Sequence, residues 1–156
     1  MKTSFLNKLA FVFLAVSFFP LFLWEKMEGL EIPVHINLFT GVPDNLGSRE
    51  FLFLMWGVAV VLYLLMLLCC KYPAMVNYPA KVGKENMHKI YPLGTIMVQR
   101  MNFSIMLLFA IIVNCVSFMA LGYIARFPIH IVWVILAYML FSGIRFTVSV
   151  RNLLAK

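Results

Sequence analysis

The feature that most constrains this chain is an unbroken apolar run over residues 51–70, which contains no charged residue. A helix of about 20 such residues covers the roughly 30 Å hydrocarbon core of a bilayer. Three further apolar runs of similar length cover residues 5–24, 103–124 and 127–144. Lipid offers the backbone no hydrogen-bond partner, and none of these runs alternates like a barrel strand, so each is predicted to be a transmembrane helix.

The composition agrees with this prediction. Hydrophobic residues make up 63% of the 156 residues and charged residues 12%, whereas soluble domains contain about 25% charged residues. We therefore predict an all-α integral membrane protein with four transmembrane helices, forming a single domain over residues 1–156. An outer loop, 25–50, and an inner loop, 71–100, separate the helices. No small-residue cleavage site follows the first run, so it is expected to be retained, with a kink at Pro20.

The basic residues predict the orientation of the helices. The two chain ends and the inner loop hold ten of them: Lys2, Lys8, Lys71, Lys81, Lys84, Lys89, Arg100, Arg145, Arg151 and Lys156. Only Lys26, Arg49 and Arg126 fall on the other side. Because loops rich in Lys and Arg stay in the cytosol, both termini are predicted to be cytosolic. The net charge of +7 is then a collar that faces lipid headgroups. Membrane lipids, and not nucleic acid, are the expected partners.

The outer loop has the pattern of an ordered element. Apolar and other residues alternate over 31–39, which predicts a short half-buried strand, with Pro33 restricting it to an edge or a strand start. Residues 41–47 are rich in turn formers. Ser48 is predicted to be the N-cap of the second transmembrane helix.

The inner loop is predicted to be irregular at first, because Pro73 and Pro79 forbid a regular helix across that stretch. A short helix is expected from Lys84. Pro92 and Gly94 are expected to break or bend it before the third transmembrane helix.

Four polar side chains of the outer loop are the candidate site: His35, Asn37, Asp44 and Asn45. His35 and Asn37 share one face of the predicted strand, and the turn returns Asp44 or Asn45 toward them. Such a cluster could bind a polar headgroup, a peptide or a metal ion. It could also be an internal hydrogen-bond network that holds the loop over the helix ends, since buried polar groups need partners in any case. Two or three ligands are fewer than most metal sites use, so the metal is left unknown.

Other polar residues favour structural roles. Asn114 and Ser117 are spaced to bond a neighbouring helix, and Gly57 and Gly143 suit close helix packing. His130 is expected at the membrane interface. The three cysteines, Cys69, Cys70 and Cys115, lack metal-site spacing and are expected to be apolar packing residues. No charged residue lies in the middle of a span, which argues against a coupled transporter. No catalytic set and no cofactor motif is evident.

The outer-loop string Ile-Pro-Val-His-Ile-Asn over 32–37, with Gly-Val-Pro-Asp over 41–44 and Gly-Ser-Arg over 47–49, resembles a bacterial signature. A family of membrane domains of unknown function carries it, and the N-terminal part of SdpI-type toxin-immunity proteins shares it. The similarity covers about residues 10–115. The motif residues it matches are Pro33, Gly41, Pro43, Gly47, Ser48 and Arg49, with Arg49 standing where Lys is common.

The resemblance implies a multi-pass protein of the bacterial cytoplasmic membrane. It implies immunity to a secreted peptide toxin less firmly, because this chain is expected to lack the longer C-terminal part of the immunity proteins. We therefore expect a non-enzymatic binding or interaction protein that uses the outer loop to recognise a peptide or a lipid headgroup. The alternative is a small membrane enzyme or metal-dependent protein that uses His35, Asn37 and Asp44. Another membrane protein, or a second copy of the chain, stays open as a partner.

Overall fold

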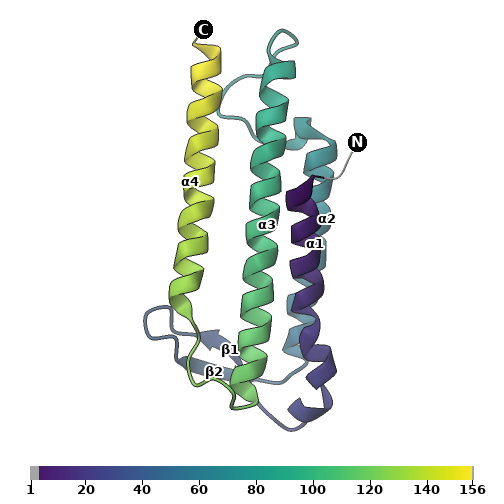
Figure 1. The fold of residues 1–156 in the computed structure, drawn as a ribbon, viewed down its shortest axis with the longest axis vertical. Helices are drawn as coiled ribbons and strands as arrows, with labels where there is room; N and C mark the ends of the chain where they lie inside the picture. Colours follow the sequence, from purple (N-terminus) through teal and green to yellow (C-terminus); the bar gives the residue numbers. More distant parts are fainter. Residues whose placement is uncertain (1–3, 156) are drawn as a thin grey trace.

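The computed structural model describes residues 4–155, in which four long helices run alternately up and down. They are α1 (Phe5–Ser17), α2 (Phe51–Lys71), α3 (Met87–Ala120) and α4 (Ile129–Leu154). A 3-10 helix, η1 (Phe19–Leu23), extends α1, so that the spans measure 19 to 34 residues and are apolar enough to cross a membrane. Both chain ends lie at one end of the bundle (Figure 1). The predicted fold class of a four-span membrane protein is confirmed.

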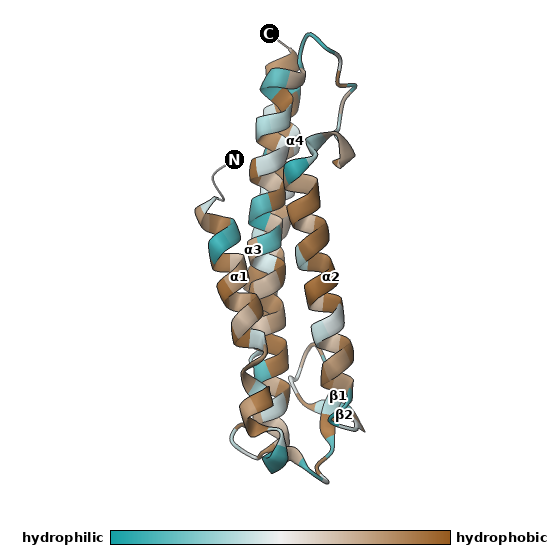
Figure 2. Cartoon of the chain, turned by 90° about the vertical axis from the view of Figure 1, so that its right-hand side faces the viewer, coloured by the Kyte–Doolittle hydropathy of each residue, from teal (hydrophilic) through white to brown (hydrophobic). Residues whose placement is uncertain are grey.

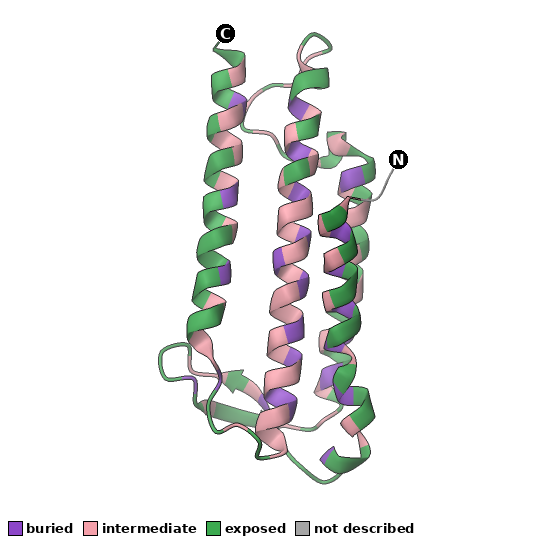
Figure 3. Ribbon diagram, viewed as in Figure 1, coloured by how far each residue is buried: buried purple, intermediate pink, exposed green. Residues whose placement is uncertain are grey.

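Helix α3 is the central helix of the bundle. It packs against α1, α2 and α4, with α1 and α2 on one side and α4 on the other (Figure 1). Buried residues are frequent along α3 and sparse along α4 (Figure 3). Hydrophobic residues fill the middle of the helices, and hydrophilic residues collect toward the ends and loops (Figure 2). This distribution is the one that a bilayer imposes on a small bundle, because lipid replaces a second layer of protein.

Near Pro20 the first span changes from an α-helix to a 3-10 helix, as expected at a residue without an N–H. The carbonyl of Ser17 accepts a hydrogen bond of 2.7 Å from Trp56 Nε1 of α2. The tryptophan thus satisfies a backbone group near the point where the α-helical ladder ends.

Of the predicted break or bend at Pro92 and Gly94, the break is wrong, because α3 starts at Met87 and continues through both residues. Pro92 is the sixth residue of the helix, so its missing N–H removes a single bond close to the helix start. Gly94 serves packing: a Cβ at this position would lie 2.3 Å from the Tyr78 Oη. Helix α4 likewise continues beyond the predicted end at residue 144 and reaches Leu154.

A two-stranded antiparallel sheet closes the end of the bundle opposite the termini (Figure 1). It consists of β1 (Ile32–Ile36) and β2 (Pro43–Gly47), with irregular pairing on both sides of His35. The predicted strand is confirmed as β1, but residues 43–47 are a second strand and not a turn. Pro43 is tolerated because it is the first residue of β2.

The predicted N-cap at Ser48 is also wrong. Its side chain makes no cap hydrogen bond to α2, whose N-terminal neighbour is Glu50. The Ser48 side chain instead interacts with the Glu50 carboxyl and lowers the pKa of that group. The backbone carbonyl of Ser48 accepts from the Phe51 N–H at 3.1 Å, which leads the chain into the helix.

Candidate functional site

The β-hairpin formed by β1 and β2 is tied to the bundle on both sides. On the α4 side, the Phe127 N–H donates to the Gly41 carbonyl at 2.9 Å, and Trp133 Nε1 donates to the Leu38 carbonyl at 3.3 Å. On the α1 side, Arg49 Nη1 donates to the Trp24 carbonyl at 2.8 Å. The Arg49 guanidinium also lies 4.7 Å from the centre of the Trp24 ring, a cation–π contact. The hairpin is therefore held in a fixed position over the helix ends.

Gly41 is required for this attachment. Its φ is +68°, a conformation that residues with a side chain rarely adopt. A Cβ there would also lie 2.4 Å from the Phe127 carbonyl oxygen, which is a backbone atom. Gly47 is less strictly required than Gly41, because a Cβ added at this position would meet a side chain, that of Val34, and not a backbone atom.

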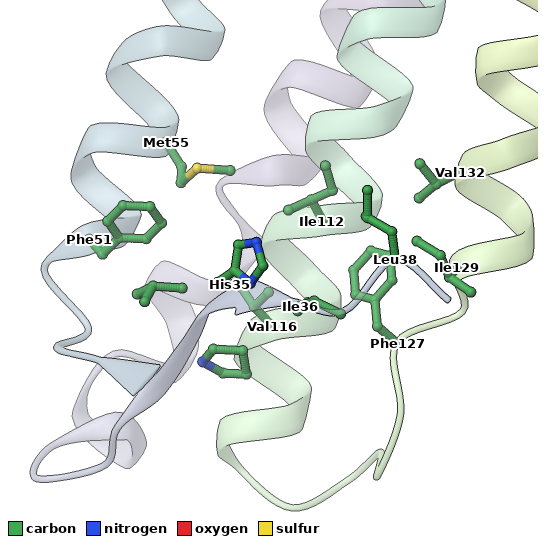
Figure 4. A pocket seen from close by; sticks show the side chains of 12 residues that line it. His35, Ile36, Leu38, Phe51, Met55, Ile112, Val116, Phe127, Ile129 and Val132 are labelled. Atoms are coloured by element: carbon green, nitrogen blue, oxygen red, sulfur yellow. The ribbon is translucent and has the colours of Figure 1, made fainter. Parts of the chain in front are cut away.

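A cavity of about 270 Å³ lies beneath the hairpin. Figure 4 shows side chains from β1, α2, α3 and α4 converging on this space. Its lining consists of Pro33, Val34, His35, Ile36, Leu38, Phe51, Met55, Ile112, Val116, Phe127, Ile129 and Val132. His35 is the one lining residue with a polar side chain. A pre-formed apolar cavity with a single polar group at its edge is typical of a site for an amphipathic ligand.

His35 and Asp44 are brought together, as the sequence predicted. The imidazole Nδ1 contacts Asp44 Oδ1 across the hairpin, an ion pair when the imidazole is protonated. The two side chains are 67% and 47% exposed. Exposed ion pairs of this kind stabilise a fold by only about 0–1 kcal/mol, because water screens them. The pair is therefore accessible to a ligand, and the backbone hydrogen bonds described above hold the hairpin in place.

Asn37 and Asn45 make contacts that differ from those of the His35–Asp44 pair. Asn37 Oδ1 accepts hydrogen bonds from the N–H groups of Phe39 at 2.9 Å and Thr40 at 3.1 Å, so it stabilises the hairpin turn. Asn45 is exposed and lies opposite His35 in the strand pairing. The predicted cluster of four thus separates into one contacting pair, one turn residue and one exposed neighbour.

The site offers few side chains that could act as metal ligands. Within residues 4–155 no group of three or more His, Cys, Asp or Glu side chains is arranged to hold a metal ion. His35 and Asp44 supply two donors, and each faces the other.

The cavity contains residues that sequence reasoning missed. Phe127 lies just before α4, and Ile129 and Val132 lie at the start of α4, all far from the hairpin in sequence. Their apolar character is the same as that of every lipid-facing residue, so no local pattern distinguishes them. Trp133 could have been noticed, because an indole N–H near a membrane surface usually bonds to a nearby acceptor.

The other polar residues have mixed outcomes. Asn114 Nδ2 donates to the Val16 carbonyl of α1 at 3.1 Å, which confirms its predicted role between helices. Ser117 is different, because its hydroxyl bonds to the Val113 carbonyl of its own helix at 2.8 Å. Gly57 and Gly143 do not serve close packing, since a Cβ at either would meet no atom within 4 Å.

A buried polar contact in the other half of the bundle was not predicted. Asn102 Nδ2 of α3 donates to Asn7 Oδ1 of α1 at 3.1 Å, and both side chains are buried. Cys70 of α2 lies 3.9 Å from Asn7 Nδ2. Such contacts hold helices together in lipid, where an unpaired amide would be unfavourable.

Comparisons were made with protein-family models, curated proteins and solved structures. None of them matches this chain.

Proposed function

We propose that this protein is a membrane-embedded binding protein that recognises an amphipathic ligand at the outer membrane surface. The apolar part of the ligand enters the cavity beneath the hairpin, and its polar part meets His35 and Asp44. The observation that supports this most directly is a pre-formed apolar cavity whose one polar lining side chain is paired with an exposed carboxylate. A peptide or a lipid headgroup with its attached chain has this chemistry.

The driving force for such binding is burial of apolar surface, at about 25 cal/mol per Å² removed from water. His35 and Asp44 add selectivity, since an imidazole and a carboxylate on adjacent strands offer both a donor and an acceptor. The rigid attachment of the hairpin reduces the ordering that binding would otherwise require.

The orientation belongs to the same proposal. The excess of basic residues at the end with the chain termini supports a cytosolic position for that end and a position outside for the hairpin. Through the resemblance of the outer loop, the membrane is the bacterial cytoplasmic membrane, and the ligand is of the kind that an immunity protein would meet.

The alternative proposal, a membrane enzyme or metal-dependent protein, has less support from the residues. Among residues 4–155, the cavity lining contains no Ser, Thr, Cys or Lys that could act as a nucleophile. The His35–Asp44 pair by itself resembles only the base and its orienting partner in an enzyme.

The test uses the purified full-length protein in lipid nanodiscs. Two probes are titrated, a dansyl-labelled fatty acid and a dansyl-labelled amphipathic peptide, and the change in directly excited dansyl fluorescence reports binding. Val132→Trp fills the cavity and should weaken binding of the preferred probe about tenfold. Val134→Trp is the matched control, because Val134 lies two residues away on α4 and outside the cavity lining. Equal affinities for the two variants would refute the proposal.

A further inference from the structure

A second hollow lies at the opposite end of the bundle, where the chain termini are. It is a groove of about 760 Å³ between α3 and α4, closed on one side by residues 77–79 of the inner loop. The lining that matters here is Tyr78, Met97, Leu140, Gly143, Thr147 and Arg151. The groove is independent of the proposed outer site, because it shares no lining residue with that cavity.

Aromatic packing fixes the inner-loop wall of the groove. The Tyr78 ring lies 5.7 Å from the Tyr91 ring and 5.9 Å from the Phe146 ring, measured between centroids. The Tyr78 hydroxyl donates to the Pro73 carbonyl at 3.0 Å. Gly94 leaves room for this hydroxyl on α3. These contacts hold the inner-loop wall in place, so the groove has a defined shape.

The helix wall leaves open space at its centre. A Cβ at Gly143 would meet no atom within 4 Å, so no protein side chain fills the position that this glycine leaves. The Thr147 hydroxyl bonds to the Gly143 carbonyl of its own helix at 3.1 Å, so it does not need a hydrogen bond from a ligand. Met97 and Leu140 make the rest of this region apolar and suited to an acyl chain.

The charge at the rim of the groove is positive and unbalanced. Arg151 is the charged residue of the lining. The ion pairs found within residues 4–155 are His35–Asp44 and Arg49–Glu50, so Arg151 has no carboxylate partner there. The only acidic residue after Glu50 is Glu85, whereas Lys and Arg are frequent at this end. A guanidinium without a carboxylate partner is well suited to a phosphate group.

We propose that this groove binds an anionic phospholipid of the leaflet at the basic end. The phosphate lies at Arg151, and an acyl chain lies along α3 and α4 past Gly143. Basic pockets between transmembrane helices bind acidic headgroups in this way. Charge complementarity selects a lipid over a second transmembrane helix as the occupant, because an apolar helix would leave the Arg151 charge unpaired.

The experiment measures retained lipid by native mass spectrometry of the full-length protein, loaded with phosphatidylglycerol or phosphatidylcholine. Wild type should retain phosphatidylglycerol preferentially. Arg151→Gln should lower that preference about five- to tenfold, the effect of one charge near a membrane surface. Arg145→Gln is the matched control, because Arg145 is exposed on the same helix but does not line the groove. It should leave the preference nearly unchanged.

Gly143→Leu tests the apolar part separately and should reduce retention of both lipids, since the added side chain occupies open space without displacing protein atoms. Excess soluble glycerol phosphate should displace little lipid, because the acyl chain contributes to binding. Equal effects of Arg151→Gln and Arg145→Gln, or ready displacement by glycerol phosphate, would overturn the proposal. The proposal would also be overturned if the Gly143→Leu variant lost a dimer peak from the mass spectrum while its lipid adducts persisted. Circular dichroism and size-exclusion chromatography confirm that each variant is folded.

Discussion

The two ends of the bundle are built on the same helices but are closed in different ways. At the hairpin end, hydrogen bonds from Phe127, Trp133 and Arg49 to backbone carbonyls hold a β-hairpin over a partly open apolar cavity. At the other end, the packing of the Tyr78 ring against Tyr91 and Phe146 holds an irregular loop beside an open groove with a basic rim. At the hairpin end His35 is paired with Asp44 and Arg49 with Glu50, whereas Arg151 at the other end has no ion-pair partner within residues 4–155. The difference teaches that a hairpin and an irregular loop close the same helices in different ways, while α4 supplies residues to both sites.

The largest expected effect concerns which end faces the cytosol. A phosphatase reporter that is active only outside the cytosol should be silent when fused after Lys156. Inserted after Gly29, in the outer loop where the structure leaves open space, it should be active. A β-galactosidase fusion, which is active only in the cytosol, serves as the control and should show the reverse pattern. Phosphatase activity after Lys156 would show that the two ends have been assigned to the wrong sides.

The next effect tests the attachment of the hairpin. Gly41→Ala should lower the free energy of unfolding in detergent by about 2–4 kcal/mol, because it combines backbone strain with a backbone clash. Gly29→Ala is the control, since Gly29 has a similar φ of +72° but open space around it. It should cost only about 1 kcal/mol, the strain alone. Thermal unfolding followed by circular dichroism measures both, and equal losses would mean that the contact with Phe127 does not matter.

The inner end should be more tolerant of the same kind of change. Gly94→Ala should cost about 1–3 kcal/mol, because the clash is with the far end of the Tyr78 side chain, which can move. In the background of Tyr78→Leu, the same change should cost much less, because the hydroxyl and ring are absent. The double-mutant cycle should therefore show a coupling energy of about 0.5 kcal/mol or more. Additive losses would show that Tyr78 does not fix this loop.

The smallest expected effect on stability is at the candidate site. His35→Ala and Asp44→Ala should each change the free energy of unfolding by about 0–1 kcal/mol, since the pair is exposed. Both changes should nonetheless weaken binding of the preferred dansyl probe. Asn37→Ala gives the contrast, because it removes two hydrogen bonds that stabilise the turn and should lower stability more. A loss of stability above about 2 kcal/mol for His35→Ala would identify the pair as a structural lock.

The sequence by itself determined the number of spans and their approximate positions. Insertion into lipid depends on the hydrophobicity of a segment taken alone, so residues 51–70 needed no tertiary information. The alternation that predicted β1 is likewise local. The proximity of His35 and Asp44 followed from a short connection between them, which any tight hairpin would provide.

Tertiary structure decided what depends on a distant partner. Residues 43–47 became a strand because β1 lies beside them, although their composition is typical of a turn. Helix α3 passes through Pro92 and Gly94, where local propensity predicted a break, and Gly94 makes room for Tyr78 from the loop. The cavity exists because Phe127, Ile129 and Val132 of a distant segment meet the hairpin. In a membrane protein apolar residues face both lipid and core, so hydrophobicity alone could not tell these cavity residues from their lipid-facing neighbours.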